Sequence, residues 1–344
     1  MDRDRIPRPP GTGVAQPPRP GRSWPPLRKA GATAVVLVAV IGLCVGLTSG
    51  EDGSLSWPWP REGQTSVLVE GTGDTGETGG AGDTGDIGDT GDIGDVATEG
   101  AQRPVPIASV TKVMTAYVIL RDHPLRAGEA GPDITVDQSA ADESGSGSES
   151  SVRVRAGQRL SERHVLELML IPSGNNIARL LARWDAGSQE SFVAKMNRAA
   201  HDLGMRHTTY SGASGIESTT TSTSTDQLKL ARRVMRDEVF RAIVAKPSTT
   251  VPGVPGPIRN TNTLLGTAGV IGLKTGSSTP AGGALMWAAT APDGAAHDRL
   301  ILGVVLHQRA GSSPQEGLQA ALDSSRTLIE AVRRWVSTTT SGTW

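Results

Sequence analysis

A serine and a lysine three residues apart, Ser109 and Lys112, open the apolar segment PIASVTKVMTAY. If this segment is a helix, the two side chains lie one turn apart on the same face. A serine at a helix N-terminus lies beside free backbone N–H groups and the positive end of the helix dipole, which stabilise an oxyanion. A lysine takes the serine proton only where burial or positive neighbours lower its pKa. The pair is a candidate nucleophile and base, although S-x-x-K also arises by chance.

A second serine lies in the segment IPSGNN, between two expected helices. In a functional interpretation, the hydroxyl of Ser173 relays a proton and the amide of Asn175 holds a substrate carbonyl. In the simpler alternative, one of the two only caps the helix that is expected to begin near Asn176.

The third segment, GLKTGSS, places Lys274 and Thr275 at the end of a predicted strand. An exposed strand edge there offers backbone groups with which an extended substrate can pair. Gly276 allows a close approach, and the N–H of Ser277 is a candidate second oxyanion donor. The alternative is an ordinary strand turn that carries a solvated lysine.

The three motifs follow one another as they do in penicillin-recognising serine acyltransferases. The segments PIASVTKVMTAYVIL, LMLIPSGNNIARLLA, IRNTNTLLG and GLKTGSSTPAGGALMWAAT resemble the serine D-alanyl-D-alanine carboxypeptidases, the low-molecular-mass penicillin-binding proteins. The resemblance covers about residues 65–336, and the abundance of Gly, Pro and Thr resembles exported proteins of actinobacteria.

This resemblance implies an α+β fold of the β-lactamase/transpeptidase type, in which an antiparallel sheet is flanked by helices and joined by a mostly helical subdomain. It implies that Ser109 is the acylated nucleophile and Lys112 its general base, and that Ser173 relays a proton to the leaving D-alanine. In some relatives an arginine lies near the substrate carboxylate; Arg309 is the arginine in that region of this chain, and its role stays open.

The resemblance also assigns the substrate contacts: Asn175 would orient the substrate amide, and Lys274 and Thr275 would bind the terminal carboxylate. The implied reaction removes the terminal D-alanine from peptidoglycan stem peptides, and β-lactams would acylate the same serine.

Three alternatives stay open. A D,D-endopeptidase differs in the shape of its cleft rather than in its motifs. A class A β-lactamase needs a deacylating glutamate in an E-x-x-L-N segment, and Glu190, Glu217 and Glu238 all lack the asparagine. A non-catalytic wall-associated protein would use the globular part for binding and a collagen-like repeat for trimerisation.

The composition argues against two other classes of protein. The 344 residues carry 34 Lys+Arg and 35 Asp+Glu, so the net charge of −1 favours no nucleic-acid partner. The six histidines show no metal-binding spacing, and Cys44 is the single cysteine. We expect neither a metal nor another cofactor.

The N-terminal region has the pattern of a membrane-anchored, exported protein. Residues 1–29 form a basic, Pro-rich tail, and residues 30–48 form an apolar anchor whose basic flank keeps that tail in the cytoplasm. A cleaved signal peptide is the alternative. Residues 49–64 are a tether, with Trp57 and Trp59 at the membrane interface, and an extracellular catalytic domain spans 65–336 before a disordered tail at 337–344.

Within that domain, residues 72–100 contain an acidic repeat with glycine at every third position from 73 to 94. Because the repeat lacks proline and its charges repel, we expect a flexible loop or linker rather than a collagen triple helix. The resemblance implies that this segment is inserted between the first strands.

Periodicity predicts the elements that position the motifs. Strands are expected at 65–71, 269–276, 283–290 and 299–307, and helices at 110–118, 161–171, 175–184, 190–203, 225–236 and 314–336. Surface loops rich in Ser, Thr and Gly are expected at 145–151 and 217–225.

Overall fold

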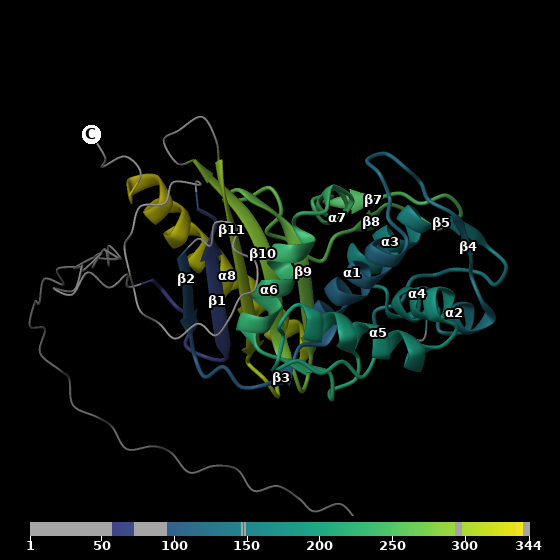
Figure 1. Cartoon of the computed structure of the whole chain (residues 1–344), viewed down its shortest axis with the longest axis horizontal. Helices are drawn as coiled ribbons and strands as arrows, with labels where there is room; N and C mark the ends of the chain where they lie inside the picture. Colours follow the sequence, from purple (N-terminus) through teal and green to yellow (C-terminus); the bar gives the residue numbers. More distant parts are fainter. Residues whose placement is uncertain (1–56, 72–94, 146, 148, 293–297, 340–344) are drawn as a thin grey trace, which may run out of the picture. The chain divides into compact units, whose positions relative to one another are not determined.

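The computed structural model describes residues 57–71, 95–145, 147, 149–292 and 298–339. Its centre is a five-stranded antiparallel sheet with the order β2-β1-β11-β10-β9 (Figure 1). The strands are β1 (Gln64–Val69), β2 (Asp95–Glu99), β9 (Val270–Ser278), β10 (Gly282–Pro292) and β11 (Asp298–Gln308). Because β1 pairs with β11, the sheet joins segments from opposite ends of the described chain.

The sheet is buried on both faces, and β10 shows how the sequence achieves this. Leu285 and Trp287 face a core shared with α8 (Pro314–Thr339), whereas Met286 and Ala288 face the core shared with the other helices. Successive side chains of a strand point to opposite faces, so an unbroken apolar run is what a central strand between two helical layers requires.

The second layer is mostly helical and contains the larger core. Its elements are η1 (Ala108–Thr111), α1 (Lys112–Asp122), α2 (Gln138–Asp142), α3 (Glu162–Leu170), α4 (Asn175–Ala186), α5 (Gln189–Asp202), α6 (Ser224–Val234) and α7 (Glu238–Val244). Three small strand pairs border it: β3 (Val105–Pro106) with β6 (Thr221–Ser222), β4 (Asp133–Thr135) with β5 (Arg159–Ser161), and β7 (Ser248–Thr249) with β8 (Ile258–Arg259).

Side-chain caps start several of these helices. Ser161 accepts a hydrogen bond from the backbone N–H of His164 at the start of α3, and Ser188 and Thr223 accept the corresponding bonds at the starts of α5 and α6. Such caps satisfy N–H groups that have no partner inside the helix.

The predicted strands and helices all lie in the structure within a few residues of their expected bounds. The helices α2 and α7 were missed, because each is too short to show two turns of periodicity. The expectation of a surface loop at 217–225 was wrong in part: Thr220, Ser222 and Thr223 are buried, and residues 221–222 form β6.

The expected tether differs from the structure where it is described. The ring of Trp57 lies 5.8 Å from that of Trp335 on α8 and is only 7% exposed. Trp59 packs beside Trp57, with 5.3 Å between the ring centroids. We expected these two rings at a membrane interface, but in the structure they pack in the apolar cluster formed with α8.

The predicted tail at 1–29, the anchor at 30–48 and most of the acidic repeat lie outside the described residues, as does the end of the chain from 340. Among the residues that are described, no helix is both long and apolar enough to span a membrane. The repeat falls between β1 and β2 in the sequence, where the resemblance implied an insertion.

A tight contact in the sheet leads to a stability prediction. Gly303 on β11 lies opposite Trp287, and a Cβ there would be 2.1 Å from the indole ring. We expect Gly303→Ala to lower the free energy of unfolding by about 1–3 kcal/mol through overpacking. Urea unfolding followed by circular dichroism measures this.

The matched test is Gly303→Ala combined with Trp287→Phe, since the smaller ring makes room for the new methyl group. The double variant should lose less stability than the sum of the two single variants. Strict additivity would contradict this packing explanation.

Candidate active site

Ser109 and Lys112 lie together at the junction of η1 and α1. The Nζ atom of Lys112 donates hydrogen bonds to Ser109 Oγ at 2.8 Å, Asn175 Oδ1 at 2.6 Å and the carbonyl of Ser214 at 2.7 Å. The lysine side chain is fully buried, whereas Ser109 is partly exposed. The amine of Lys112 is therefore enclosed and faces the serine rather than solvent.

A sharp backbone turn positions Ser109. Ala108 has a φ of 45°, and its carbonyl accepts a hydrogen bond from Thr111 Oγ1 at 2.7 Å. Gly215, at φ 79°, passes so close that a Cβ there would lie 2.0 Å from the same carbonyl. Only glycine fits both the positive φ and this contact, so the 211–215 loop is held against η1.

That loop supplies Ser214, which the sequence analysis missed. Thr115, one turn after Lys112, donates a hydrogen bond to the carbonyl of Ala213 at 2.7 Å, and Lys112 donates to the next carbonyl. One face of α1 therefore fixes two successive carbonyls of the loop. The two glycines of this loop, Gly212 and Gly215, were the sequence signal that its backbone could pack closely against another element.

The segment IPSGNN brings Asn175 to Lys112, and its capping interpretation is not supported. The residue that caps α4 is Gly174, which has no side chain to bond the helix, and Asn175 is the first helical residue. Ser173 adopts a left-handed backbone with φ 67° and is 5% exposed. The three acceptors already described account for the three N–H donors of a protonated Lys112, so Ser173 is not among them.

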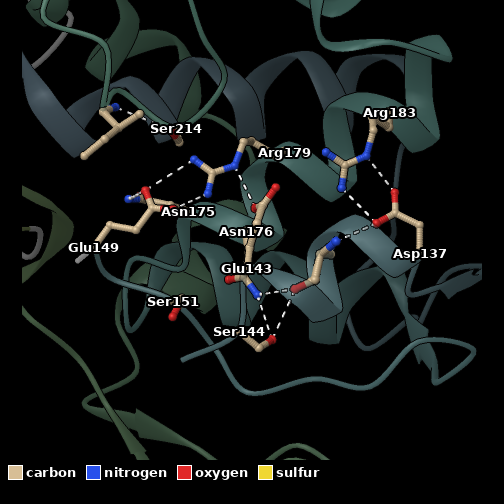
Figure 2. Close-up of polar contacts among 12 residues, drawn as sticks. Asp137, Glu143, Ser144, Glu149, Ser151, Asn175, Asn176, Arg179, Arg183 and Ser214 are labelled. Atoms are coloured by element: carbon tan, nitrogen blue, oxygen red, sulfur yellow. Dashed lines mark hydrogen bonds and ion pairs between the residues drawn. The ribbon is translucent and has the colours of Figure 1, made fainter. Parts of the chain in front are cut away.

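The amide of Asn175 connects Lys112 to an ion pair. Its Nδ2 donates to Glu149 Oε2 at 2.7 Å, and Glu149 in turn accepts hydrogen bonds from Arg179 on α4 (Figure 2). Arg179 also binds Glu143 through Nε at 2.8 Å. None of these three charged residues was singled out from the sequence, and the 145–151 segment, expected to be only a surface loop, contributes Glu149.

The third motif lies on β9, the edge strand of the sheet. Lys274 is buried and donates to the carbonyl of Thr275 at 2.9 Å. A Cβ on Gly276 would lie 3.1 Å from the backbone nitrogen of Ser109, so this glycine allows β9 to approach η1. Ser277 follows on the same strand and is partly exposed.

Thr261, from the segment IRNTNT, positions the strand motif. Its hydroxyl lies 2.6 Å from that of Thr275, and its N–H donates to the carbonyl of Ile171, just before Ser173. The sequence analysis gave Thr261 no role, although it lies in a segment that carried the resemblance.

Burial sets the electrostatics of both lysines. Desolvation lowers the pKa of Lys112 well below its ordinary value, and the charges of Lys274 and Arg179 lower it further. The carboxylates of Glu149 and Glu217 act in the opposite direction. Burial alone lowers the pKa of Lys274 to about 7. Desolvation disfavours the charged form of an amine, which is what a general base near neutral pH requires.

Arg309 interacts with Glu62 and Glu316 in the structure. Its backbone N–H donates to Glu62 at 3.2 Å. Hydrogen bonds from Ser313 lower the pKa of Glu316, and the charge of Arg309 lowers it further. Within the described residues, no three His, Cys, Asp or Glu side chains gather as a metal site would need.

Comparison of the sequence with known proteins identifies a family whose members the chain resembles. A family model described as D-alanyl-D-alanine carboxypeptidase matches residues 89–309. The chain is 32% identical over 209 residues to the D-alanyl-D-alanine carboxypeptidase of Streptomyces sp. (strain K15), a match that covers 56% of this chain and 71% of that protein. It is 35% identical over 192 residues to a D-alanyl-D-alanine endopeptidase of Pseudomonas aeruginosa, covering 54% of this chain and 60% of that one.

Solved structures confirm the predicted fold. The crystal structure of the Streptomyces K15 DD-transpeptidase superposes with a TM-score of 0.59 at 26% identity, covering 68% of this chain and 90% of that one. Penicillin binding protein 6B from Escherichia coli gives 0.59 at 24% identity, covering 79% and 81%. The predicted α+β fold of the transpeptidase type is confirmed, and the chain belongs to the D-alanyl-D-alanine carboxypeptidase family of serine peptidases.

Proposed function

We propose that this chain removes the terminal D-alanine from peptidoglycan stem peptides through an acyl-enzyme on Ser109. The observation that carries the proposal is the buried amine of Lys112, 2.8 Å from Ser109 Oγ. A buried, desolvated amine in contact with a partly exposed hydroxyl is the arrangement that activates a serine.

The hydrogen bonds around Lys112 favour proton transfer from Ser109. A neutral lysine has two N–H donors and one lone pair. The oxygens of Asn175 and Ser214 only accept hydrogen bonds, so they take the two N–H groups. The lone pair then faces the serine hydroxyl, and Nζ takes the proton as Oγ attacks the carbonyl carbon between the two D-alanines.

The edge strand β9 supplies the substrate contacts in this proposal. The ammonium of Lys274 and the hydroxyl of Thr275 bind the terminal carboxylate, and the charge of the lysine favours that anion in a buried site. The N–H groups of Ser109 and Ser277 stabilise the oxyanion. Gly276 lets the strand lie close to the backbone nitrogen of Ser109, and in this proposal both donors face one carbonyl oxygen.

Completion of the reaction needs a second proton transfer and a water molecule. As the C–N bond breaks, Ser173 passes the proton that Lys112 took from Ser109 to the leaving nitrogen of D-alanine. Water then attacks the ester of Ser109: its hydroxyl stays on the shortened peptide, and its remaining proton returns to the serine oxygen as that bond breaks. β-Lactams acylate the same serine and are released slowly.

We also propose that the chain acts outside the cytoplasm. The family works on peptidoglycan, and the predicted anchor at 30–48 would hold the catalytic domain at the outer face of the membrane.

Acylation gives the first functional prediction. The mass of the intact chain should rise by one penicillin on incubation with a fluorescent penicillin, and Ser109→Ala should abolish this adduct because the attacking oxygen is gone. Ser191→Ala, which removes an exposed hydroxyl on α5, is the control and should label normally. Full labelling of Ser109→Ala would contradict the assignment.

Product analysis separates the alternatives. Release of D-alanine from a linear peptide supports the carboxypeptidase, preferential cleavage of a cross-linked muropeptide supports the endopeptidase, and rapid turnover of penicillin supports the β-lactamase.

The two lysines predict a bell-shaped pH dependence of kcat/KM for a peptide ending in D-Ala-D-Ala. The rate rises with pH as Lys112 becomes neutral, and falls as Lys274 loses the charge that binds the carboxylate. Because the pKa of Lys274 is about 7, the descending limb should begin near that pH.

The substitution Lys274→Arg tests this, since a guanidinium stays charged throughout the range. The descending limb should disappear, at a lower absolute rate. Lys195→Arg, in a partly buried ion pair with Asp122 and Asp185 that has no contact with either lysine, should leave both limbs unchanged. A descending limb that persists in Lys274→Arg would show that another group causes it.

A further inference from the structure

Beside the proposed base lies an ion pair to which the mechanism above gives no role. Glu149 and Arg179 bind each other, and Glu149 also binds the amide of Asn175, the residue that contacts Lys112 (Figure 2). We propose that the Glu149–Arg179 pair is a positioning device that fixes the orientation of the Asn175 amide and so aims Lys112 at Ser109. This inference rests on the proposed role of Lys112 as the general base.

The two ends of the Asn175 amide differ chemically, so its orientation matters. The oxygen accepts from Lys112, and the nitrogen only donates. If the amide turned over, its N–H groups would face the amine and compete with the Ser109 hydroxyl for the lone pair. The carboxylate of Glu149 accepts only, so it binds the nitrogen end and excludes the turned arrangement. The second N–H of Asn175 stays available for a substrate carbonyl.

The backbone places Glu149 at this position. The N–H of Asn175 donates to the carbonyl of Ser150 at 2.8 Å, directly after Glu149. The side-chain amide of Asn176 binds both backbone groups of Val152, accepting from its N–H at 3.0 Å and donating to its carbonyl at 2.9 Å. The loop is thus attached to the first turn of α4, and Glu149 is held beside the site by backbone contacts that do not involve its own side chain.

Arg179 then fixes the carboxylate itself. It lies one turn after Asn175 on α4, so both contact the same glutamate. Its guanidinium binds Glu149 through two nitrogens and Glu143 through the third, and only 11% of its side chain is exposed. A planar fork bound on two sides has little freedom to turn, which is how an arginine orients a carboxylate.

The same pair acts on Lys112 with opposite signs. The groups that face the amine are Glu149, Glu217, Arg179 and Lys274; the two carboxylates raise its pKa and the two cations lower it. When one member of the pair is removed, the charge of the other therefore shifts the pKa of Lys112 without opposition. A role in folding alone would give no such opposite effects, so the pH profile of acylation distinguishes positioning from structure.

The experiment measures the rate of acylation by a fluorescent penicillin across pH in the full chain. In Glu149→Gln the side-chain oxygen still accepts from Asn175 but the negative charge is gone, so the ascending limb should move to lower pH with most of the plateau rate retained. In Arg179→Gln the unpaired carboxylate raises the pKa of Lys112, so the limb should move to higher pH. The double variant should return towards the wild-type midpoint.

Orientation is tested separately by Glu149→Ala, which removes the acceptor. Its plateau rate should fall about tenfold or more, because the amide can then turn and Lys112 is no longer aimed at Ser109. Recovery of the plateau in Glu149→Gln relative to Glu149→Ala identifies the hydrogen bond rather than the charge as the cause.

A matched control lies one turn further along the same helix. Arg183 binds Asp137 through two nitrogens at 2.6 and 2.8 Å and does not contact Asn175 (Figure 2). Arg183→Gln breaks a comparable ion pair, so it should leave the midpoint and the plateau unchanged. Equal shifts in this control, shifts of the same sign in Glu149→Gln and Arg179→Gln, or an unchanged plateau in Glu149→Ala would each overturn the inference.

This outcome is distinguishable from failure of the proposed function. If Ser109→Ala still forms the penicillin adduct, the nucleophile has been misassigned. If that adduct is lost but the profiles of the Glu149 and Arg179 variants match the wild type, only the positioning role is wrong.

Discussion

The burial of the Lys112 amine is the constraint on which the site depends. Removing an ammonium from water costs several kcal/mol unless oxygens replace the lost solvent, so a buried amine without such oxygens would destabilise the fold. Three segments far apart in the sequence supply those oxygens: η1 through Ser109, α4 through Asn175 and the 211–215 loop through Ser214. Folding that satisfies the lysine therefore also assembles the site around it.

Hydrogen bonds connect the three motifs to one another. Asn175 joins the lysine to α4, while Thr261 joins Thr275 on β9 to the carbonyl of Ile171, at the end of α3. A displacement of the edge strand relative to the helical layer would break these bonds. The sheet and the helices therefore present one rigid frame to a substrate, which favours the fixed geometry that acyl transfer needs.

The parts of the fold and of the site that depend on the spacing of neighbouring residues could be predicted from the sequence. Ser109 and Lys112 share one turn, and the strands β10 and β11 contain long apolar runs, so both could be predicted from the sequence. Ser214 contributes only a carbonyl, which every residue possesses, and Glu149 comes from a polar loop without periodicity. Their roles arise from contacts between distant segments, and no pattern in a single sequence reports such contacts.

The position of the long insertion has a consequence for how this chain can vary. Val69 on β1 pairs directly with Asp95 on β2. The two strands are therefore in register immediately before and after the inserted segment. That hairpin lies at one border of the sheet and the substrate strand β9 at the other. The entropic cost of closing a loop grows only slowly with its length. The loop between β1 and β2 can therefore lengthen during evolution without any rearrangement of the catalytic groups.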